Sequence, residues 1–212
     1  MSKYSYIPLE FEGLSTIPIA DRGGKVQIEH MGAAPEAGVR MSKWLDGLPK
    51  ILAAESLRSV VAALNEAKRK QRAILWGMGG HVIKCGLAPV LTELMDMGYG
   101  TGLVMNGAAT IHDFEIGIAG ATSEDVESVL PDGRFGSAEE TGREMNVAIR
   151  EGAARGIGMG EALGEAITRL AKPEFAGACL QMQAYRRNVP VTVQRAGGTD
   201  TPHTHTAAEG SA

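Results

Sequence analysis

The sequence has few of the residues that cross-link or anchor a protein. Its two cysteines, Cys85 and Cys179, lie far apart without a CxxC partner, so we expect neither a disulfide framework nor a cysteine metal site. No run of about 18 apolar residues is present, which argues against a transmembrane helix. The N-terminus also lacks the apolar core of a signal peptide. These absences predict a soluble, cytoplasmic protein with free thiols.

Aromatic residues and blocks of like charge are scarce as well. Phe, Trp and Tyr make up 5% of the chain, and few of them lie near its one basic cluster at residues 68–72. This combination disfavours a nucleic-acid surface, and the cluster is more typical of a charged helix end. Glycine, in contrast, is abundant at 28 of 212 residues. It favours close packing of helices on a sheet and ligand sites lined by backbone.

The chain falls into three parts. Residues 1–40 are rich in glycine and proline without a sustained period, which predicts an extended arm with a short strand at 26–28. Residues 41–195 alternate helical and strand-like patterns and form the predicted main domain. Residues 196–212 are small and polar, and we expect a loose tail or the start of a further part of the protein.

The main domain shows the pattern of a parallel sheet. An apolar run at 73–76 is stopped by glycines, which is typical of a buried parallel strand. Further strands are expected at 103–105 and 189–193. Helices are expected at 42–52, 57–66, 87–95, 137–149 (opened by a Ser-x-x-Glu capping box), 159–171 and from Pro173. This order predicts an α/β fold with a Rossmann-like parallel sheet flanked by helices.

Two small-residue turns follow neighbouring strands of this sheet. The first turn contributes Gly77, Gly79, Gly80 and His81, and the second contributes Asn106, Gly107 and Ala108. A glycine-rich turn that leads into a helix lets backbone N–H groups approach a phosphate. Ligands of open α/β sheets bind outside the carboxyl ends of the strands, so the two turns predict a shared crevice for a nucleotide. The first turn does not have the GxGxxG spacing, however, and a tight turn without a ligand explains it at least as well.

Ionisable residues follow the second turn. His112, Asp113 and Glu115 could orient a ribose or act as an acid–base pair. They could equally be an exposed helical turn whose acids complement the helix dipole. His203 and His205 have the spacing that places two imidazoles on one face of a strand, but no third ligand is identifiable, so no metal site is predicted.

Three segments around these turns, at 75–83, 105–115 and 132–136, resemble a bacterial branch of the deoxyhypusine-synthase-like family. The resemblance covers roughly residues 15–205. It implies NAD as cofactor, a homotetramer, and transfer of an aminobutyl group from a polyamine such as spermidine to an amine acceptor. It also implies that NAD is contacted by both turns, by His112 and Asp113, and by Asp200 in the segment Gly198-Thr199-Asp200.

The chain departs from the family at several of these positions. The hydroxyl donors and the asparagine of the family's first NAD turn are replaced here by glycine and His81, and a histidine that contacts substrate is Asn188. The family's catalytic lysine has no match in this chain, since Lys84 lies on the wrong element. The chain is therefore either part of a longer enzyme or a protein with another role. The alternatives are a non-catalytic nucleotide- or metabolite-binding protein and a hydrolase that uses His112 with Asp113 or Glu115.

Overall fold

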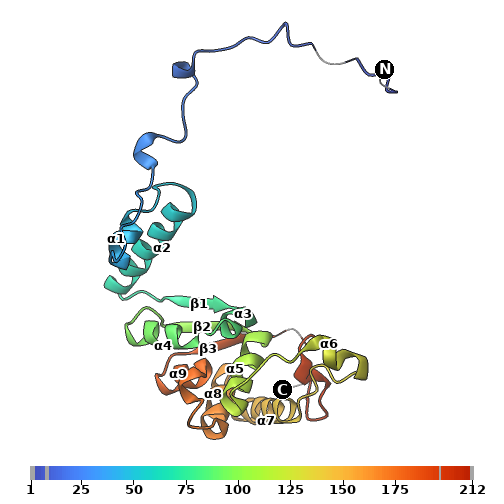
Figure 1. Ribbon diagram of the computed structural model, residues 1–212. Coiled ribbons are helices and arrows are strands. Elements are labelled where there is room, and N and C mark those ends of the chain that lie inside the picture. Colours follow the sequence, from blue (N-terminus) through green and yellow to red (C-terminus); the bar gives the residue numbers. More distant parts are fainter. Residues whose placement is uncertain (1–2, 8–9, 196, 211–212) are drawn as a thin grey trace. The chain divides into compact units, whose positions relative to one another are not determined.

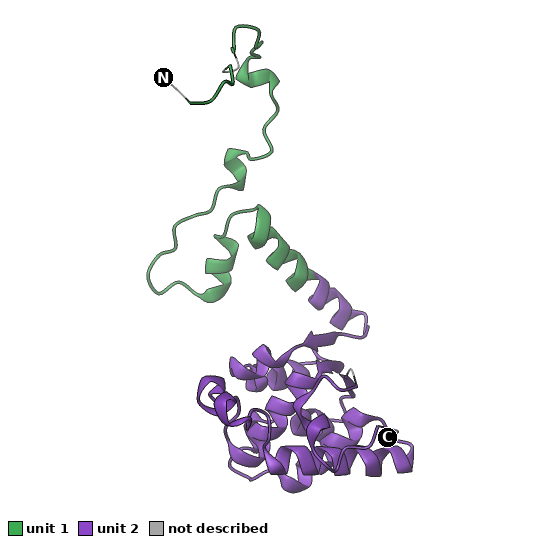
Figure 2. Ribbon diagram, turned by 90° about the vertical axis from the view of Figure 1, so that its right-hand side faces the viewer, with its two compact units in different colours: residues 1–62 green, residues 63–212 purple. Residues whose placement is uncertain are grey.

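A computed structural model of the protein describes residues 3–7, 10–195 and 197–210 and divides into two compact units. Unit 1 comprises residues 1–62 and unit 2 residues 63–212 (Figure 2). The boundary lies inside helix α2 (Leu52–Arg69), whereas the sequence places it near residue 40. Arg58 accounts for the difference, because its guanidinium donates hydrogen bonds to the carbonyls of Leu45 (3.0 Å) and Pro49 (2.8 Å) and so ties the start of α2 to the segment before it.

Unit 1 is an arm followed by helical segments. It contains two 3₁₀ turns, η1 (Ile19–Asp21) and η2 (Ile28–His30), helix α1 (Met41–Asp46) and the first part of α2. The strand predicted at 26–28 is wrong, because the backbone turns at Ile28, where the amide of His30 donates to the carbonyl of Gln27 (3.0 Å).

Unit 2 alternates strands and helices (Figure 1). After the end of α2, its elements are β1 (Leu75–Met78), α3 (Gly80–Lys84), α4 (Ala88–Asp96), β2 (Gly102–Asn106), α5 (Gly107–Ala119), α6 (Val126–Val129), η3 (Leu130–Asp132), α7 (Glu139–Arg155), α8 (Met159–Leu170), η4 (Ala176–Ala178), α9 (Leu180–Arg186), β3 (Val191–Gln194) and η5 (Thr201–Thr204). Across the described part of the chain, no helix has both the length and the apolar character needed to cross a membrane.

The three strands form one parallel sheet in the order β1-β2-β3. Met78 pairs with Met105, and Asn106 pairs with Gln194, so all three strands end at the same edge. The fold is therefore α/β, with a small open sheet flanked by helices. The three parallel strands are confirmed, although the first continues through Gly77 instead of stopping before it. Its predicted burial is wrong, because β1 lies at an edge of the sheet and Leu75 is exposed.

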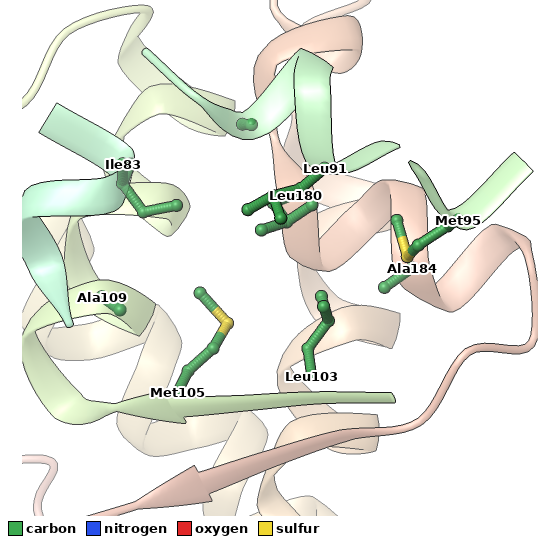
Figure 3. Packing of buried hydrophobic residues seen from close by; sticks show 9 residues of the cluster. Ile83, Leu91, Met95, Leu103, Met105, Ala109, Leu180 and Ala184 are labelled. Carbon is green, nitrogen blue, oxygen red and sulfur yellow. The ribbon is translucent and has the colours of Figure 1, made fainter. Parts of the chain in front are cut away.

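Helix α5 is fixed by two hydrophobic clusters. Ala109 belongs to the first, which joins Leu103 and Met105 of β2 to residues of α3, α4 and α9 (Figure 3). Phe114 belongs to the second, with residues of α7 and α8. Phe114 and Met105 are completely buried, and burying a large apolar side chain contributes about 1.5–3 kcal/mol. The two clusters thus fix the position of α5 in unit 2.

Two predicted helix starts are displaced, at Ser137 and at Pro173, while the helix expected at 87–95 is confirmed. The capping box at Ser137 is wrong, since α7 begins at Glu139 without a side-chain cap. The helix expected at 87–95 is α4, which is preceded by the separate short helix α3 and by Gly86 in a left-handed conformation. The helix expected from Pro173 is replaced by η4 and α9, because a buried carboxylate from Asp113 accepts hydrogen bonds from the first amides of α9.

Candidate functional site

The two predicted turns lie side by side, but direct contacts fill the space between them. A Cβ atom placed on Gly79 would lie 3.4 Å from Nδ2 of Asn106. One placed on Gly80 would lie 2.9 Å from Cδ2 of His112 and 3.3 Å from Cβ of Ala108. None of the glycines in this turn has the left-handed backbone that requires glycine. The small size of Gly80 therefore serves the close approach of α3 to α5, whereas Gly77 has open space around it.

The second turn is closed by two polar side chains. Asn106 caps α5, because its Oδ1 accepts a hydrogen bond from the amide of Ala109 at 2.8 Å. A Cβ atom on Gly107 would overlap the carboxylate of Asp200, which shows how closely this carboxylate approaches the first residue of the helix. An anion is favoured at that position by the helix dipole and by the unpaired amides of the first turn.

Asp113 lies on the opposite side of α5 and is completely buried. Its carboxylate accepts hydrogen bonds from the amides of Leu180 (2.6 Å) and Gln181 (2.7 Å) and from the Cys179 thiol (3.4 Å). Burial raises the pKa of Asp113, and these hydrogen bonds oppose that effect. The residue holds α9 against α5 and cannot contact a ligand as predicted. His81 is exposed on α3.

A cavity of about 1100 Å³ opens on the free face of α5. Small-molecule sites typically measure about 300–1,000 Å³, so it can hold a metabolite or a nucleotide. Its walls are α5, the loop after α5, the loop before α7, and residues 199–202. Of the predicted site residues, Ala108, His112 and Asp200 line it, as does Glu115, whereas Gly77, Gly79, Gly80, His81, Asn106, Gly107 and Asp113 do not.

A chain of hydrogen bonds runs along the cavity wall. The hydroxyl of Thr122 donates to one carboxylate oxygen of Glu115, and the hydroxyl of Thr141 donates to the other at 3.3 Å. Nδ1 of His112 lies 2.7 Å from Oγ1 of Thr122. Because the Thr122 hydroxyl donates to Glu115, its oxygen accepts a hydrogen bond from the protonated Nδ1 of His112. The imidazole therefore keeps a lone pair on Nε2.

The environment of His112 keeps it neutral. Partial burial lowers the pKa of His112, and the positive charge of Lys84 lowers it further, while Glu115 opposes both. A neutral imidazole with a free Nε2 is a proton acceptor at neutral pH. His112 and Glu115 could be paired from the sequence by their i, i+3 spacing on a helix. Thr122 and Thr141 could not be assigned to the site from the sequence, because only the folded loop after α5 and the packing of α7 bring them to this wall.

The cavity wall carries charges of both signs, namely Lys84 and Lys172 and four carboxylates. Three of its carboxylates are engaged by the chain itself: Glu115 by the two threonines, Glu124 by the amide of Gly136 (2.6 Å), and Asp200 by the guanidinium of Arg195 (2.9 Å). Among the described residues, Lys84 and Lys172 on the wall have no ion pair, and one further acid, Glu140, has none either. The hydrogen-bonded carboxylates keep their negative charge, so positive charge on this wall is confined to the places of the two lysines.

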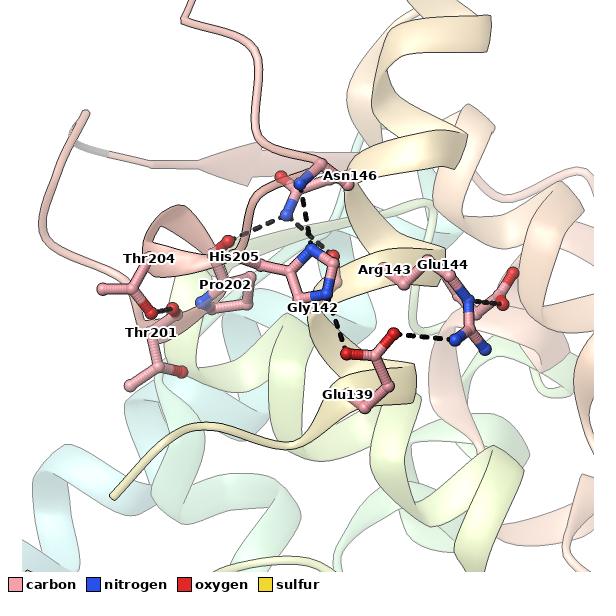
Figure 4. A network of polar contacts seen from close by, with 10 residues as sticks. Glu139, Gly142, Arg143, Glu144, Asn146, Thr201, Pro202, Thr204 and His205 are labelled. Carbon is pink, nitrogen blue, oxygen red and sulfur yellow. Dashed lines mark hydrogen bonds and ion pairs between the residues drawn. The ribbon is translucent and has the colours of Figure 1, made fainter. Parts of the chain in front are cut away.

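The C-terminal segment is part of the cavity and not the loose tail expected from its composition. Nδ2 of Asn146 donates to the carbonyl of Pro202 (2.8 Å), and Nε2 of His205 lies 3.1 Å from Glu139 (Figure 4). Gly142 of α7 has no side chain, which leaves room for the His205 ring. Specific polar contacts, invisible to a composition argument, thus dock residues 201–205 onto α7.

The two C-terminal histidines do not act together. Nδ1 of His203 accepts a hydrogen bond from the amide of Asp200 (3.2 Å), while His205 pairs with Glu139. In the residues that the structure describes, no three His, Cys, Asp or Glu side chains are grouped so that they could hold a metal ion.

Comparisons with known proteins assign no family. No protein-family model and no curated protein matches the chain. Among solved structures, it is similar to a "conserved putative LOR/SDH protein" from Methanococcus maripaludis S2, with 15% sequence identity and a TM-score of 0.45. The match covers 87% of this chain and 49% of the other, so the chain spans about half the length of that structure.

The predicted membership of the deoxyhypusine-synthase-like family is therefore wrong, since the structural similarity is to a protein of another description and no family model supports the prediction. The polyamine donor, the amine acceptor and the tetramer were implied only by that resemblance, and they lose their support with it.

Proposed function

We propose that unit 2 is a Rossmann-like domain that binds a small anionic metabolite in the cavity beside α5, and that His112 acts there as a general base. The observation that carries the proposal is the hydrogen-bonded chain from Glu115 through Thr122 to His112, which leaves Nε2 of a neutral imidazole free at the cavity wall. A fixed tautomer beside a ligand cavity is the arrangement that general-base catalysis needs.

The chain of hydrogen bonds also supports the protonated state. When Nε2 takes a proton from the ligand, Nδ1 continues to donate to Thr122, and the Glu115 carboxylate lies 3.8 Å from Nδ1, close enough to stabilise the imidazolium. A positioned base of this kind typically accelerates proton transfer by about 10²–10⁴-fold. Lys84 and Lys172 would attract the ligand's negative charge.

The alternative is a non-catalytic protein that binds a nucleotide in the same cavity, with NAD as the ligand predicted from the sequence. The parallel sheet supports it, because the carboxyl ends of such strands are where nucleotides bind. Asp200 lies beside Gly107, however, so a pyrophosphate would have to displace this carboxylate to reach the second turn. The first turn offers only α3, a helix of five residues.

Nitrogen-15 NMR of His112 tests the proposed base without knowledge of the substrate. We expect a neutral ring protonated on Nδ1, with an inflection below the ordinary histidine pKa of 6.5. Thr122→Val should remove the acceptor and shift the ring toward the Nε2 tautomer. Thr92→Val, which deletes a hydroxyl from α4 that bonds only its own helix, is the matched control. A ring already protonated on Nε2 in the unmodified protein would contradict the proposal.

Calorimetric titrations of citrate, inorganic phosphate and NAD test the anionic ligand. Binding of one of them should weaken in Lys84→Gln and in Lys172→Gln. Lys50→Gln, in unit 1, is the control for loss of one positive charge. The enzymatic and non-catalytic alternatives separate in His112→Asn, because turnover of a ligand identified in this way should fall while its binding persists. Equal binding by all lysine variants would exclude an anion site at this wall.

A further inference from the structure

Arg195 is a buried cation that uses only part of its hydrogen-bonding capacity. It follows directly after β3, and its side chain is 5% exposed. Nε donates to Oδ2 of Asp200 at 2.9 Å, whereas Nη2 is buried and has no hydrogen-bond partner. Nε and Nη2 form one edge of the guanidinium, called the fork below, which can bind an oxyanion through two parallel hydrogen bonds. Asp200 fills one half of this fork.

The same carboxylate lies at the start of α5. Asp200 approaches Gly107 so closely that no side chain would fit there. The helix has 13 residues, enough for a developed dipole, and the amides of its first turn have no partners within the helix except where Asn106 caps Ala109. One carboxylate of the chain itself therefore accepts a hydrogen bond from Arg195 and lies against the first residue of α5.

This position is reachable from the cavity. Asp200 and Ala108, the second residue of α5, both line the cavity wall. The segment before Asp200 contains Gly198 in a left-handed conformation (φ 81°), a backbone state that glycine adopts without strain. Asp200 is also the N-cap of the short turn η5, and its side chain takes part in a capping box with His203 there.

We propose that Arg195 and the N-terminus of α5 form a phosphate site that Asp200 holds until a phosphate group of the cavity ligand displaces it. A tetrahedral phosphate has enough oxygens to meet Nε, Nη2 and the helix amides together, which the planar carboxylate of Asp200 does not do here. The inference rests on the proposed function only in that the cavity ligand is anionic. It adds that the ligand carries a phosphate and that the chain competes with it.

Titration of inorganic phosphate, followed by the amide signal of Gly107 and the Nε signal of Arg195, tests this site. Asp200→Asn removes the competing charge and should tighten phosphate binding by about tenfold, since apparent affinity is reduced by the fraction of molecules whose site is closed. Asp96→Asn is the matched control, because it also removes a carboxylate paired with an arginine, Arg187 at 2.7 Å, far from this site in the sequence. It should leave phosphate binding unchanged.

Two further measurements cover the case in which Asp200→Asn does not fold. In the unmodified protein, phosphate should shift the Gly107 and Arg195 signals at high concentration, and Arg195→Lys, which keeps the charge but loses the fork, should abolish the shift. Acetate at the same ionic strength should have no such effect. The proposal is overturned if Asp200→Asn binds phosphate no more tightly than Asp96→Asn, if acetate matches phosphate, or if neither signal moves in the unmodified protein.

The outcome is independent of the proposed base. If phosphate binds as described while His112 is protonated on Nε2, the phosphate site stands and the proposed base fails. If His112 has the expected tautomer and phosphate moves neither signal, the base stands and the phosphate site fails.

Discussion

Two carboxylates on helix α5 lie two residues apart in sequence and have opposite surroundings. Asp113 is completely buried, and its oxygens meet two backbone amides, an amide side chain and a thiol. Glu115 lies at the cavity wall, where it meets two threonine hydroxyls and, through one of them, His112. Since each helical residue rotates by about 100°, neighbours in sequence face different parts of the molecule.

The comparison shows how a structural carboxylate differs from one suited to chemistry. Asp113 is bonded only to groups that cannot move without disturbing α9, so it has no capacity left for a ligand. Glu115 is bonded to side chains that also border open space. Whether a carboxylate can still contact a ligand, and not its residue type, distinguishes the structural role of Asp113 from the role of Glu115 at the cavity.

The largest effect that we expect comes from removing the buried carboxylate. Asp113→Ala leaves two buried amides of α9 without acceptors, which should lower the free energy of unfolding by about 2–4 kcal/mol. Glu115→Ala leaves two hydroxyls that water in the cavity can reach, so the loss should be about 1 kcal/mol. Urea unfolding of both variants measures the difference. Equal losses would contradict the distinction between the two faces.

The reactivity of the two cysteines tests whether the buried face of α5 stays closed in solution. Burial, followed by the nearby charge of Asp113, raises the pKa of the Cys179 thiol, while Cys85 is exposed. Ellman's reagent should therefore label Cys85 at once and Cys179 at least about 100-fold more slowly, since a buried thiol reacts only after local or global opening. Cys85→Ser leaves the slow phase alone for measurement. Fast labelling of Cys179 in that variant would show that the contact between α5 and α9 is open in solution.

Replacing glycines of the first turn should have a smaller effect on stability. Gly80→Ala brings a methyl group within 2.9 Å of the His112 ring and should cost about 1–3 kcal/mol through overpacking. Gly77→Ala has open space around the new methyl and should change stability little. Thermal unfolding compares the variants, and the His112 NMR signals should move only in Gly80→Ala. A stable Gly80→Ala variant and a destabilised Gly77→Ala variant would contradict the packing role of Gly80.

The sheet could be predicted from the sequence because its signals are local. Continuous apolar runs stopped by small residues mark β1 and β2, and the period of two marks β3. The pairing of His112 with Glu115 was likewise within reach, since helical spacing alone places them together.

The rest of the site depends on contacts between distant segments. Thr141 reaches Glu115 from a helix 26 residues further along, and Asp200 reaches Gly107 from the end of the chain. The glycines of the first turn are compatible in sequence with either a phosphate loop or a tight turn without a ligand, and in the structure Gly80 serves the packing of one helix on another. Small residues have the same appearance in sequence for either purpose, so only the neighbouring atoms distinguish the two.

The smallest effect that we expect is a change in the free energy of unfolding with pH, caused by the titration of His112 at the cavity wall. Burial and the charge of Lys84 lower the pKa of His112 in the folded protein, so the unfolded chain binds its proton more readily. The contribution to stability is present above pH 6.5 and is lost as the pH falls through the lowered folded pKa, with His203 acting in the same direction. His112→Asn should flatten the decline of the free energy of unfolding between pH 7.5 and pH 5, measured in urea at about 0.15 M salt. An unchanged slope in that variant would show that the His112 face is as open to water as the unfolded chain, and the contrast with the sealed face of Asp113 would then disappear.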